Sequence, residues 1–253
     1  MERDETREKR AKSSPFERTV AVYFDIDGTL LETRSDEDEI VETAAAFDVD
    51  VSDEGVRKFD ELVAQYFRRN VADGYRAAVR TFTNHLGAEV DADAFSRALK
   101  RRKVENTRLV GGASETLAAF ADVATVGIIT NGAGDIQREK LARHAIDDRF
   151  EHVLISGERE TMKPKDEMFA LAKSEGSADD YVYVADRFAD DIVPASENGF
   201  VTVWISDASS SVADITVPSL PELTVDAVAD ALYSNGNGEA RHTVERSEER
   251  NDE

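Results

Sequence analysis

The sequence has no cysteine, and this absence excludes disulfide bonds, thiolate metal ligands and cysteine nucleophiles. Long apolar runs are also missing, since none approaches the roughly 18 uncharged residues that a membrane-spanning helix needs. The N-terminus is a mixture of charged residues without the apolar core of a signal peptide. Because 41% of the 253 residues are hydrophobic, the chain can bury a full core. We therefore expect a soluble, cytoplasmic globular protein that does not bind membranes.

Basic residues are scarce relative to acidic ones, with 31 Lys and Arg against 53 Asp and Glu and a net charge of -22. This balance argues against a nucleic-acid partner, because contacts to phosphates need a basic face. Self-repulsion at this charge density destabilises a compact state unless salt screens it. We interpret the composition as that of a protein from a high-salt cytoplasm, such as that of a halophilic archaeon; an ordinary acidic protein is the alternative.

Apolar runs and helical patterns alternate along the middle of the chain. They lie between two charged segments, 1–18 and 234–253, that we expect to be disordered. The alternation favours an α/β fold, a doubly wound parallel sheet with helices on both faces. The predicted strands are 19–25, 123–130, 153–156, 181–186 and 201–205. The predicted helices are 113–121, 135–145, 167–173, 190–198 and 225–233.

The segment 32–108 interrupts this alternation, because it contains no convincing strand and at least four helical patterns. Ser35, Ser52 and Asp91 stand where helix N-caps are expected. We therefore predict a helical cap domain inserted after the first strand. The core domain then comprises 19–31 and 109–233.

The most informative motif is Asp25-Ile26-Asp27-Gly28-Thr29-Leu30, which directly follows the apolar run 20–24. Carboxylates at the end of a buried strand are costly unless a metal or a reaction uses them. Residues two apart on a strand point to the same side, so Asp25 and Asp27 can converge on one site, and Gly28 lets the chain turn sharply away. One carboxylate could then attack a substrate while the other transfers a proton.

Three further predicted strands are followed by polar groups that suit an anionic substrate and a metal. Ligands of open parallel sheets bind beyond the carboxyl ends of the strands, where these groups would meet. Each group alone has an ordinary explanation as a turn, a solvated loop or a helix-capping pair. Their order and shared placement at strand ends favour one functional site. The groups are Thr130 with Asn131, then Lys163, then Asp186 with Asp191.

With these motifs in this order, the chain resembles the haloacid dehalogenase superfamily of aspartate-nucleophile hydrolases over about residues 19–233. The resemblance implies a Rossmann-like core with a helical cap of the family's first class. The fourth motif departs from the family pattern, which commonly has Gly and then Ser or Thr where this chain has Ala185 and Arg187. The matches are 25–30 to the first motif, Thr130 to the second, Lys163 to the third, and Asp186 and Asp191 to the fourth.

The resemblance implies a catalytic role for the two aspartates of the first motif. Asp25 is similar to the nucleophile that attacks phosphorus and forms an aspartyl-phosphate. Asp27 is similar to the general acid that protonates the leaving oxygen and then activates water. Mg²⁺ would be held by Asp25, the backbone carbonyl of Asp27, and Asp186, with Asp191 contributing directly or through another ligand.

The other matched residues imply a phosphate-binding site. Thr130 and the backbone N–H of Asn131 would hold phosphate oxygens. Lys163 would neutralise the charge shared by the phosphate and the nucleophile. Lys165 is the alternative for that role, although Lys163, directly before Pro164, fits the pattern better.

The resemblance also ranks the possible reactions. Haloacid dehalogenases of this fold lack an aspartate at the position of Asp27, because halide leaves without protonation. Its presence favours a phosphatase acting on a small phosphorylated metabolite, such as a nucleotide, a sugar phosphate or phosphoglycolate. The same residues are also compatible with a phosphomutase and with a non-catalytic regulator that binds a phosphorylated ligand.

Arginines in the cap are candidate substrate ligands. Arg76 and Arg80 are four residues apart and share a helix face, from which their guanidinium groups could clamp a second anionic group. Exposed arginines that balance surface carboxylates are the alternative. The four histidines share no ligand spacing and predict no metal site. Trp204 fits the core end of the fifth predicted strand.

Overall fold

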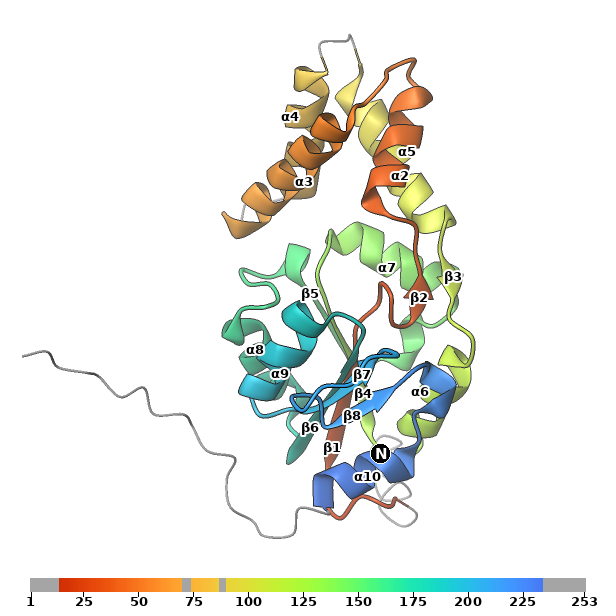
Figure 1. Ribbon diagram of the computed structural model, residues 1–253, viewed down its shortest axis with the longest axis vertical. Coiled ribbons are helices and arrows are strands. Elements are labelled where there is room, and N and C mark those ends of the chain that lie inside the picture. The colour runs from red at the N-terminus through yellow and green to blue at the C-terminus, as the bar shows by residue number, and fades with distance from the viewer. Residues whose placement is uncertain (1–13, 70–73, 87–89, 234–253) are drawn as a thin grey trace, which may run out of the picture.

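The computed structural model describes residues 14–69, 74–86 and 90–233. Within them, a six-stranded parallel sheet has the strand order β5-β4-β1-β6-β7-β8 (Figure 1). The chain builds one side of the sheet outward from β1, then crosses over β1 to build the other, which confirms the predicted doubly wound topology. The strands are β1 (Val20–Phe24), β4 (Thr125–Thr130), β5 (His152–Ile155), β6 (Asp180–Ala185), β7 (Val201–Ile205) and β8 (Ile215–Val217).

Helices cover both faces of the sheet, because side chains alternate along the fully buried strand β1. Its even-numbered residues share a hydrophobic cluster with α6 and α10, and its odd-numbered residues share another with α8 and α9. None of the described helices is both long enough and apolar enough to cross a membrane. The helices of the core are α6 (Ala113–Ala121), α7 (Gly134–Arg143), α8 (Asp166–Gly176), α9 (Val193–Glu197) and α10 (Val225–Tyr233).

Four helices between β1 and β4 form what we call the cap, and they have their own hydrophobic cluster around Phe59, Phe82 and Phe95. The predicted N-caps are confirmed: the side chains of Ser35, Ser52 and Asp91 each accept a backbone N–H of the following turn. The cap helices are α2 (Asp36–Ala45), α3 (Asp53–Arg68), α4 (Gly74–His85) and α5 (Ala92–Glu105).

Two short strands join the cap to the core, β2 (Leu31–Glu32) and β3 (Arg108–Leu109), which pair antiparallel (Figure 1). The sequence predicted no strand between 32 and 108. Strands of two residues leave no apolar run from which they could be recognised. The segment that enters the cap and the segment that returns to the core therefore lie side by side, directly after the first motif.

The structure corrects three further expectations. Phe16 is buried in the core and Arg18 pairs with Asp180, so residues 14–18 belong to the ordered fold rather than to a disordered tail. The sheet gains a sixth strand, β8, because Ile215–Val217 pairs with β7 although it is only three residues long. The helix predicted at 190–198 begins as a π-helical turn, η3 (Phe188–Ile192), before α9. The remaining expected tails, 1–13 and 234–253, lie outside the described residues.

Candidate active site

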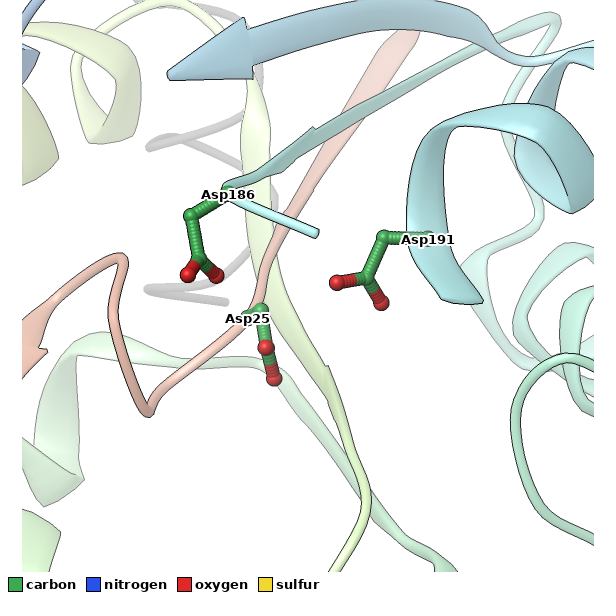
Figure 2. Close-up of side chains that lie close together, drawn as sticks. All are labelled: Asp25, Asp186 and Asp191. Atoms are coloured by element: carbon green, nitrogen blue, oxygen red, sulfur yellow. The ribbon is translucent and has the colours of Figure 1, made fainter. Parts of the chain in front are cut away.

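Three aspartates converge beyond the carboxyl ends of β1 and β6 (Figure 2). Asp25 follows β1, Asp186 follows β6 and Asp191 lies in η3. One carboxylate oxygen of each lies within 4.8 Å of the others. Among the described residues this is the one group of acidic or histidine side chains placed to hold a metal ion. The sequence analysis placed Asp25, Asp186 and Asp191 in one metal site with the backbone carbonyl of Asp27, and the structure brings the side chains of these three aspartates together.

Gly28 makes room for this cluster. Its φ of +88° lies in the left-handed region that favours glycine, and a Cβ there would meet Asp186 Oδ2 at 2.2 Å. Its N–H donates to the carbonyl of Leu31, which closes the turn after the first motif. Gly28 is therefore required both by the turn and by the approach of Asp186.

Lys163 contacts two of the three aspartates, with Nζ 3.1 Å from Asp25 Oδ1 and 2.5 Å from Asp191 Oδ1. It is 3% exposed, whereas Lys165 is exposed, so Lys163 is the lysine that reaches the aspartates. Burial opposes its charge, but Asp25 and Asp191 together raise the pKa of Lys163, and the ammonium stays protonated.

Tyr183 is a member of the site that the sequence did not reveal. Its hydroxyl accepts a hydrogen bond from Lys163 Nζ at 2.8 Å and lies 3.1 Å from Asp191 Oδ1 and 3.0 Å from the carbonyl of Ile129. It comes from the middle of β6, where an aromatic residue in an apolar strand predicts core packing and nothing more. The Tyr183 hydroxyl, from within β6, holds the Lys163 ammonium in position.

The electrostatics of the cluster fit a cation. Burial raises the pKa of Asp25 and of Asp186, although Lys163 opposes the shift at Asp25. Asp191 Oδ2 is buried and accepts no hydrogen bond from the residues the structure describes, and Asp25 Oδ1 is buried beside Lys163. The Lys163 ammonium pairs with two of the three carboxylates, so negative charge remains to be compensated. Carboxylate oxygens are the ligands that Mg²⁺ prefers, and this donor set fits it.

The carboxylate of Asp27 contacts side chains of α7 and is not a member of the three-aspartate cluster. Lys140 Nζ lies 2.6 Å from Asp27 Oδ1, and the amide of Gln137 donates to Oδ2 at 2.9 Å. The same amide nitrogen also lies 3.1 Å from Thr130 Oγ1. Gln137 and Lys140 are buried polar residues one turn apart on α7. The sequence predicted no contact for them, because only the fold brings α7 beside Asp27.

Thr130 and Asn131 lie at the end of β4, as predicted, on the edge of the sheet that carries the aspartates. The side chain of Asn131 has a role that the sequence did not indicate. Its Nδ2 donates to the carbonyl of Lys163 at 2.9 Å, and its Oδ1 accepts the N–H of Lys163 at 2.9 Å. This pair of hydrogen bonds ties the loop that carries Lys163 to the end of β4.

Two residues beside the fourth motif shape its surroundings. Trp204 donates its indole N–H to the carbonyl of Asp186 at 2.9 Å, which holds the backbone of that aspartate. Arg187 is exposed, and although burial opposes its charge, the nearby Asp186, Asp25 and Asp191 raise its pKa. The departure from the family pattern therefore adds a positive charge at the rim of the cluster.

The cap arginines pair with a carboxylate of the cap. Arg76 and Arg80 lie 3.1 and 3.0 Å from Asp93 Oδ1, with 49% and 58% of their side chains exposed. This geometry matches the alternative of arginines that balance a surface carboxylate. Of the histidines within the described ranges, none joins a cluster placed to hold a metal.

Comparisons with known proteins agree with this geometry. A sequence model described as haloacid dehalogenase-like hydrolase matches residues 22–205. Glyceraldehyde 3-phosphate phosphatase from Pyrococcus furiosus is 33% identical over 137 residues, which are 50% of this chain and 57% of that protein. The 2-haloacid dehalogenase from Pseudomonas syringae superposes with a TM-score of 0.67 at 22% identity, over 83% of this chain and 98% of that one.

A second solved structure, the magnesium-bound putative HAD-hydrolase YfnB from Bacillus subtilis, gives a TM-score of 0.63 at 20% identity. It covers 81% of this chain and 97% of its own. These structural similarities show a shared fold. The chain spans about half the length of the curated relatives it matches.

Proposed function

Because the chain belongs to the haloacid dehalogenase-like hydrolase family, we propose that it is a Mg²⁺-dependent phosphatase. It hydrolyses a small phosphate monoester through an aspartyl-phosphate intermediate. The observation that carries this proposal is the cluster of Asp25, Asp186 and Asp191, with the buried Lys163 paired to Asp25 and Asp191. The phosphatase activity in the name of the Pyrococcus relative supports the same reaction class.

The first step is attack by Asp25 on phosphorus. A bond forms between a carboxylate oxygen of Asp25 and phosphorus, and the bond from phosphorus to the leaving oxygen breaks. That oxygen takes a proton from Asp27 and leaves as an alcohol. In the second step Asp27 accepts a proton from water, whose oxygen attacks the phosphorus of the aspartyl-phosphate. The bond between the Asp25 oxygen and phosphorus breaks, which releases phosphate, regenerates the carboxylate of Asp25 and leaves Asp27 protonated for the next turnover.

Asp27 is positioned for this proton transfer by α7. Lys140 and Gln137 hold its carboxylate, and Gln137 also contacts Thr130, so the proton donor and the phosphate-binding loop share one support. The presence of Asp27 is the feature that favours a phosphate ester over a haloacid, because an alkoxide needs a proton and a halide does not.

Lys163, Thr130 and the N–H of Asn131 would bind the phosphate oxygens and stabilise their negative charge. Lys163 is fixed for this task by Tyr183 and by the side chain of Asn131. Mg²⁺, held by Asp25, Asp186 and Asp191 with the carbonyl of Asp27, would neutralise the negative charges that otherwise keep a carboxylate from a phosphate.

The substrate we propose is a small phosphorylated metabolite. Glyceraldehyde 3-phosphate is the first ester to test because it appears in the names of three relatives, and a pyrimidine 5′-nucleotide is the second because a further relative from Escherichia coli is a pyrimidine 5′-nucleotidase.

The proposal is tested by phosphate release from these esters in molar KCl, with Mg²⁺ or with EDTA. We expect release only with Mg²⁺, and loss of at least about a thousandfold in Asp25→Asn, because the nucleophile is removed. Asp190→Asn is the matched control, since Asp190 is an exposed neighbour outside the cluster. Release that persists in Asp25→Asn, or no release from any phosphate ester, would overturn the proposal.

A further inference from the structure

A second polar cluster lies in the cap, formed by Lys103 of α5, Asp36 at the start of α2 and Tyr75 at the start of α4. Lys103 Nζ lies 2.5 Å from Asp36 Oδ1 and 5.5 Å from the centre of the Tyr75 ring. The lysine side chain is 13% exposed and that of Asp36 is 61% exposed. One buried cation thus contacts a solvent-accessible carboxylate and an aromatic face.

Tyr75 provides the first sign that this cluster receives a ligand. The residue is 9% exposed, and its ring packs edge-on against Phe59 at a centroid distance of 6.1 Å. Its hydroxyl is buried and makes no well-formed hydrogen bond to a described residue, and the nearby Lys103 ammonium only partly offsets the effect of burial, which raises its pKa. A buried hydroxyl without a partner is unfavourable by about 1–3 kcal/mol, so a polar atom arriving beside it would be bound favourably.

The position of Lys103 provides the second sign. Helix α5 packs against α7, and Lys100 lies 2.8 Å from Asp135 and 2.9 Å from Glu139 of that helix. Lys103 is one turn further along the same face of α5. Helix α7 also carries Lys140, which holds Asp27. Figure 1 shows α2 and α5 above α7, and the contacts of Lys100 with α7 place this stretch of α5 beside the core.

The electrostatics agree with this placement. Burial opposes the charge on Lys103, but Tyr75, Asp36 and, from the core, Asp27 raise its pKa. Burial also opposes the charge on Asp36, but Lys103 and, from the core, Lys140 and Arg187 lower its pKa. Both groups therefore stay charged and lie within electrostatic reach of the active-site residues.

We propose that Lys103, Asp36 and Tyr75 bind the leaving group of the substrate, and that they select an uncharged group bearing hydroxyl or carbonyl oxygens. This inference rests on the proposed phosphatase function and specifies its substrate class. An alcohol beside the cluster finds a donor in Lys103, an acceptor in Asp36 and either in Tyr75.

Charge pairing is what disfavours an anionic leaving group. Each lysine on this side of the site is already paired, Lys103 with Asp36 and Lys140 with Asp27. A substrate with a carboxylate beyond its phosphate would have to displace Asp36 from Lys103, or Asp27 from Lys140, to pair with either lysine, and that exchange adds no net ion pair. A three-carbon polyol or hydroxyaldehyde phosphate meets no such penalty.

The test compares three esters: glycerol 3-phosphate, phosphoglycolate and p-nitrophenyl phosphate. The last reports the chemical step, because its aromatic leaving group carries neither an alcohol hydroxyl nor a carbonyl group. We expect Lys103→Met and Tyr75→Phe to lower kcat/KM for glycerol 3-phosphate about tenfold while leaving p-nitrophenyl phosphate within about twofold, because each removes a contact to the alcohol. Lys58→Met is the matched control, since Lys58 is an exposed cap lysine paired with Glu61.

Asp36→Asn gives the opposite and sharper result. Removing this carboxylate frees Lys103 to pair with the carboxylate of phosphoglycolate, so the ratio of kcat/KM for phosphoglycolate over glycerol 3-phosphate should rise at least about tenfold. Equal losses of kcat/KM on all three esters in Lys103→Met and Tyr75→Phe, or an unchanged ratio in Asp36→Asn, would overturn the inference. The phosphatase proposal would still stand if the native protein hydrolyses p-nitrophenyl phosphate. Absence of hydrolysis of every ester by the native protein would instead overturn the phosphatase proposal and this inference with it.

Discussion

The core site and the cap arrange their charges in opposite ways. In the core, Asp25, Lys163 and Asp191 are at most 5% exposed, and each position is fixed by groups from several strands. In the cap, Arg76 and Arg80 share one carboxylate with about half of each side chain exposed. Buried charges are costly and are retained where chemistry needs them, whereas exposed pairs contribute little and can change freely. We infer that the core determines the reaction and the cap determines which ester enters.

Removing the central lysine should have the largest effect on the core. Lys163→Met leaves Asp25 and Asp191 buried without a cation, so we expect roughly 3–5 kcal/mol of lost stability in EDTA. Phosphate release should fall at least about a hundredfold, because charge on the transferring group is no longer neutralised. Urea unfolding and phosphate release measure the two effects.

The same variant also tests the metal site. If the aspartates hold Mg²⁺, the loss of stability in Lys163→Met should be smaller in Mg²⁺ than in EDTA, since the ion replaces the missing positive charge. Lys165→Met is the control and should behave as the native protein, because that side chain is exposed. Equal unfolding midpoints with and without Mg²⁺ would contradict a metal ion among these carboxylates.

Adding one carbon atom at Gly28 should have the next largest effect. In Gly28→Ala the new methyl group would lie 2.2 Å from Asp186 Oδ2 at a φ of +88°, so either the turn or the aspartate must shift. A displacement of about 1 Å in a catalytic constellation can cost about a hundredfold in rate, and we expect a loss of that size together with weaker Mg²⁺ activation. Titration of activity with Mg²⁺ measures both. Gly111→Ala, whose Cβ would meet nothing within 4 Å, should retain native activity.

Lys163 and Gly28, together with Asp25, show how much of the site the sequence predicts. Asp25, Gly28 and Lys163 lie at or beyond strand ends, and local sequence determines where strands end, so their convergence could be predicted. Lys163 was distinguished from Lys165 by its place before Pro164, and its burial agrees with that choice.

The supporting contacts could not be predicted, because they join residues far apart in the chain. Tyr183 reaches Lys163 from inside an apolar strand, and Lys140 reaches Asp27 from a separate helix. Nothing in the pattern of either segment distinguishes a partner of the active site from a core or surface residue. Burial of an ionisable side chain on a helix such as α7 becomes visible only once the fold is known.

The same limit applies to the fold. The parallel sheet and the insertion follow from period and length, which long elements display clearly. The strand β8 and the paired strands β2 and β3 are two or three residues long, and their partners, not their own sequence, make them strands. Phe16 lies in a charged segment whose composition suggested disorder, yet its buried ring and the pair of Arg18 with Asp180 hold residues 14–18 against the core.

Salt should affect the whole molecule more gently than either core substitution. At a net charge of -22, we propose that the native state gains stability as KCl rises to molar concentrations, because the screening length falls from about 10 Å to about 3 Å. The midpoint of thermal unfolding should rise steadily between dilute and molar KCl. Sucrose, which is excluded from protein surfaces without screening charge, serves as the comparison. A midpoint that is equal in dilute and molar KCl would remove the high-salt interpretation.

The smallest effect is expected from the exposed cap arginines, where the sequence left two roles open. Arg76 and Arg80 both reach Asp93 on α5, and their hydrogen bonds lower the pKa of that carboxyl. If the pair serves only to balance Asp93, Arg76→Gln with Arg80→Gln should leave KM for the preferred ester within about twofold, since exposed ion pairs contribute little. A several-fold rise in KM with kcat unchanged would show uniform binding of the substrate by these side chains. Arg76 and Arg80 would then join Lys103 in recognising the ester. In that case the exposed charges of α4 would belong to the substrate-binding site and not to a surface that can change freely.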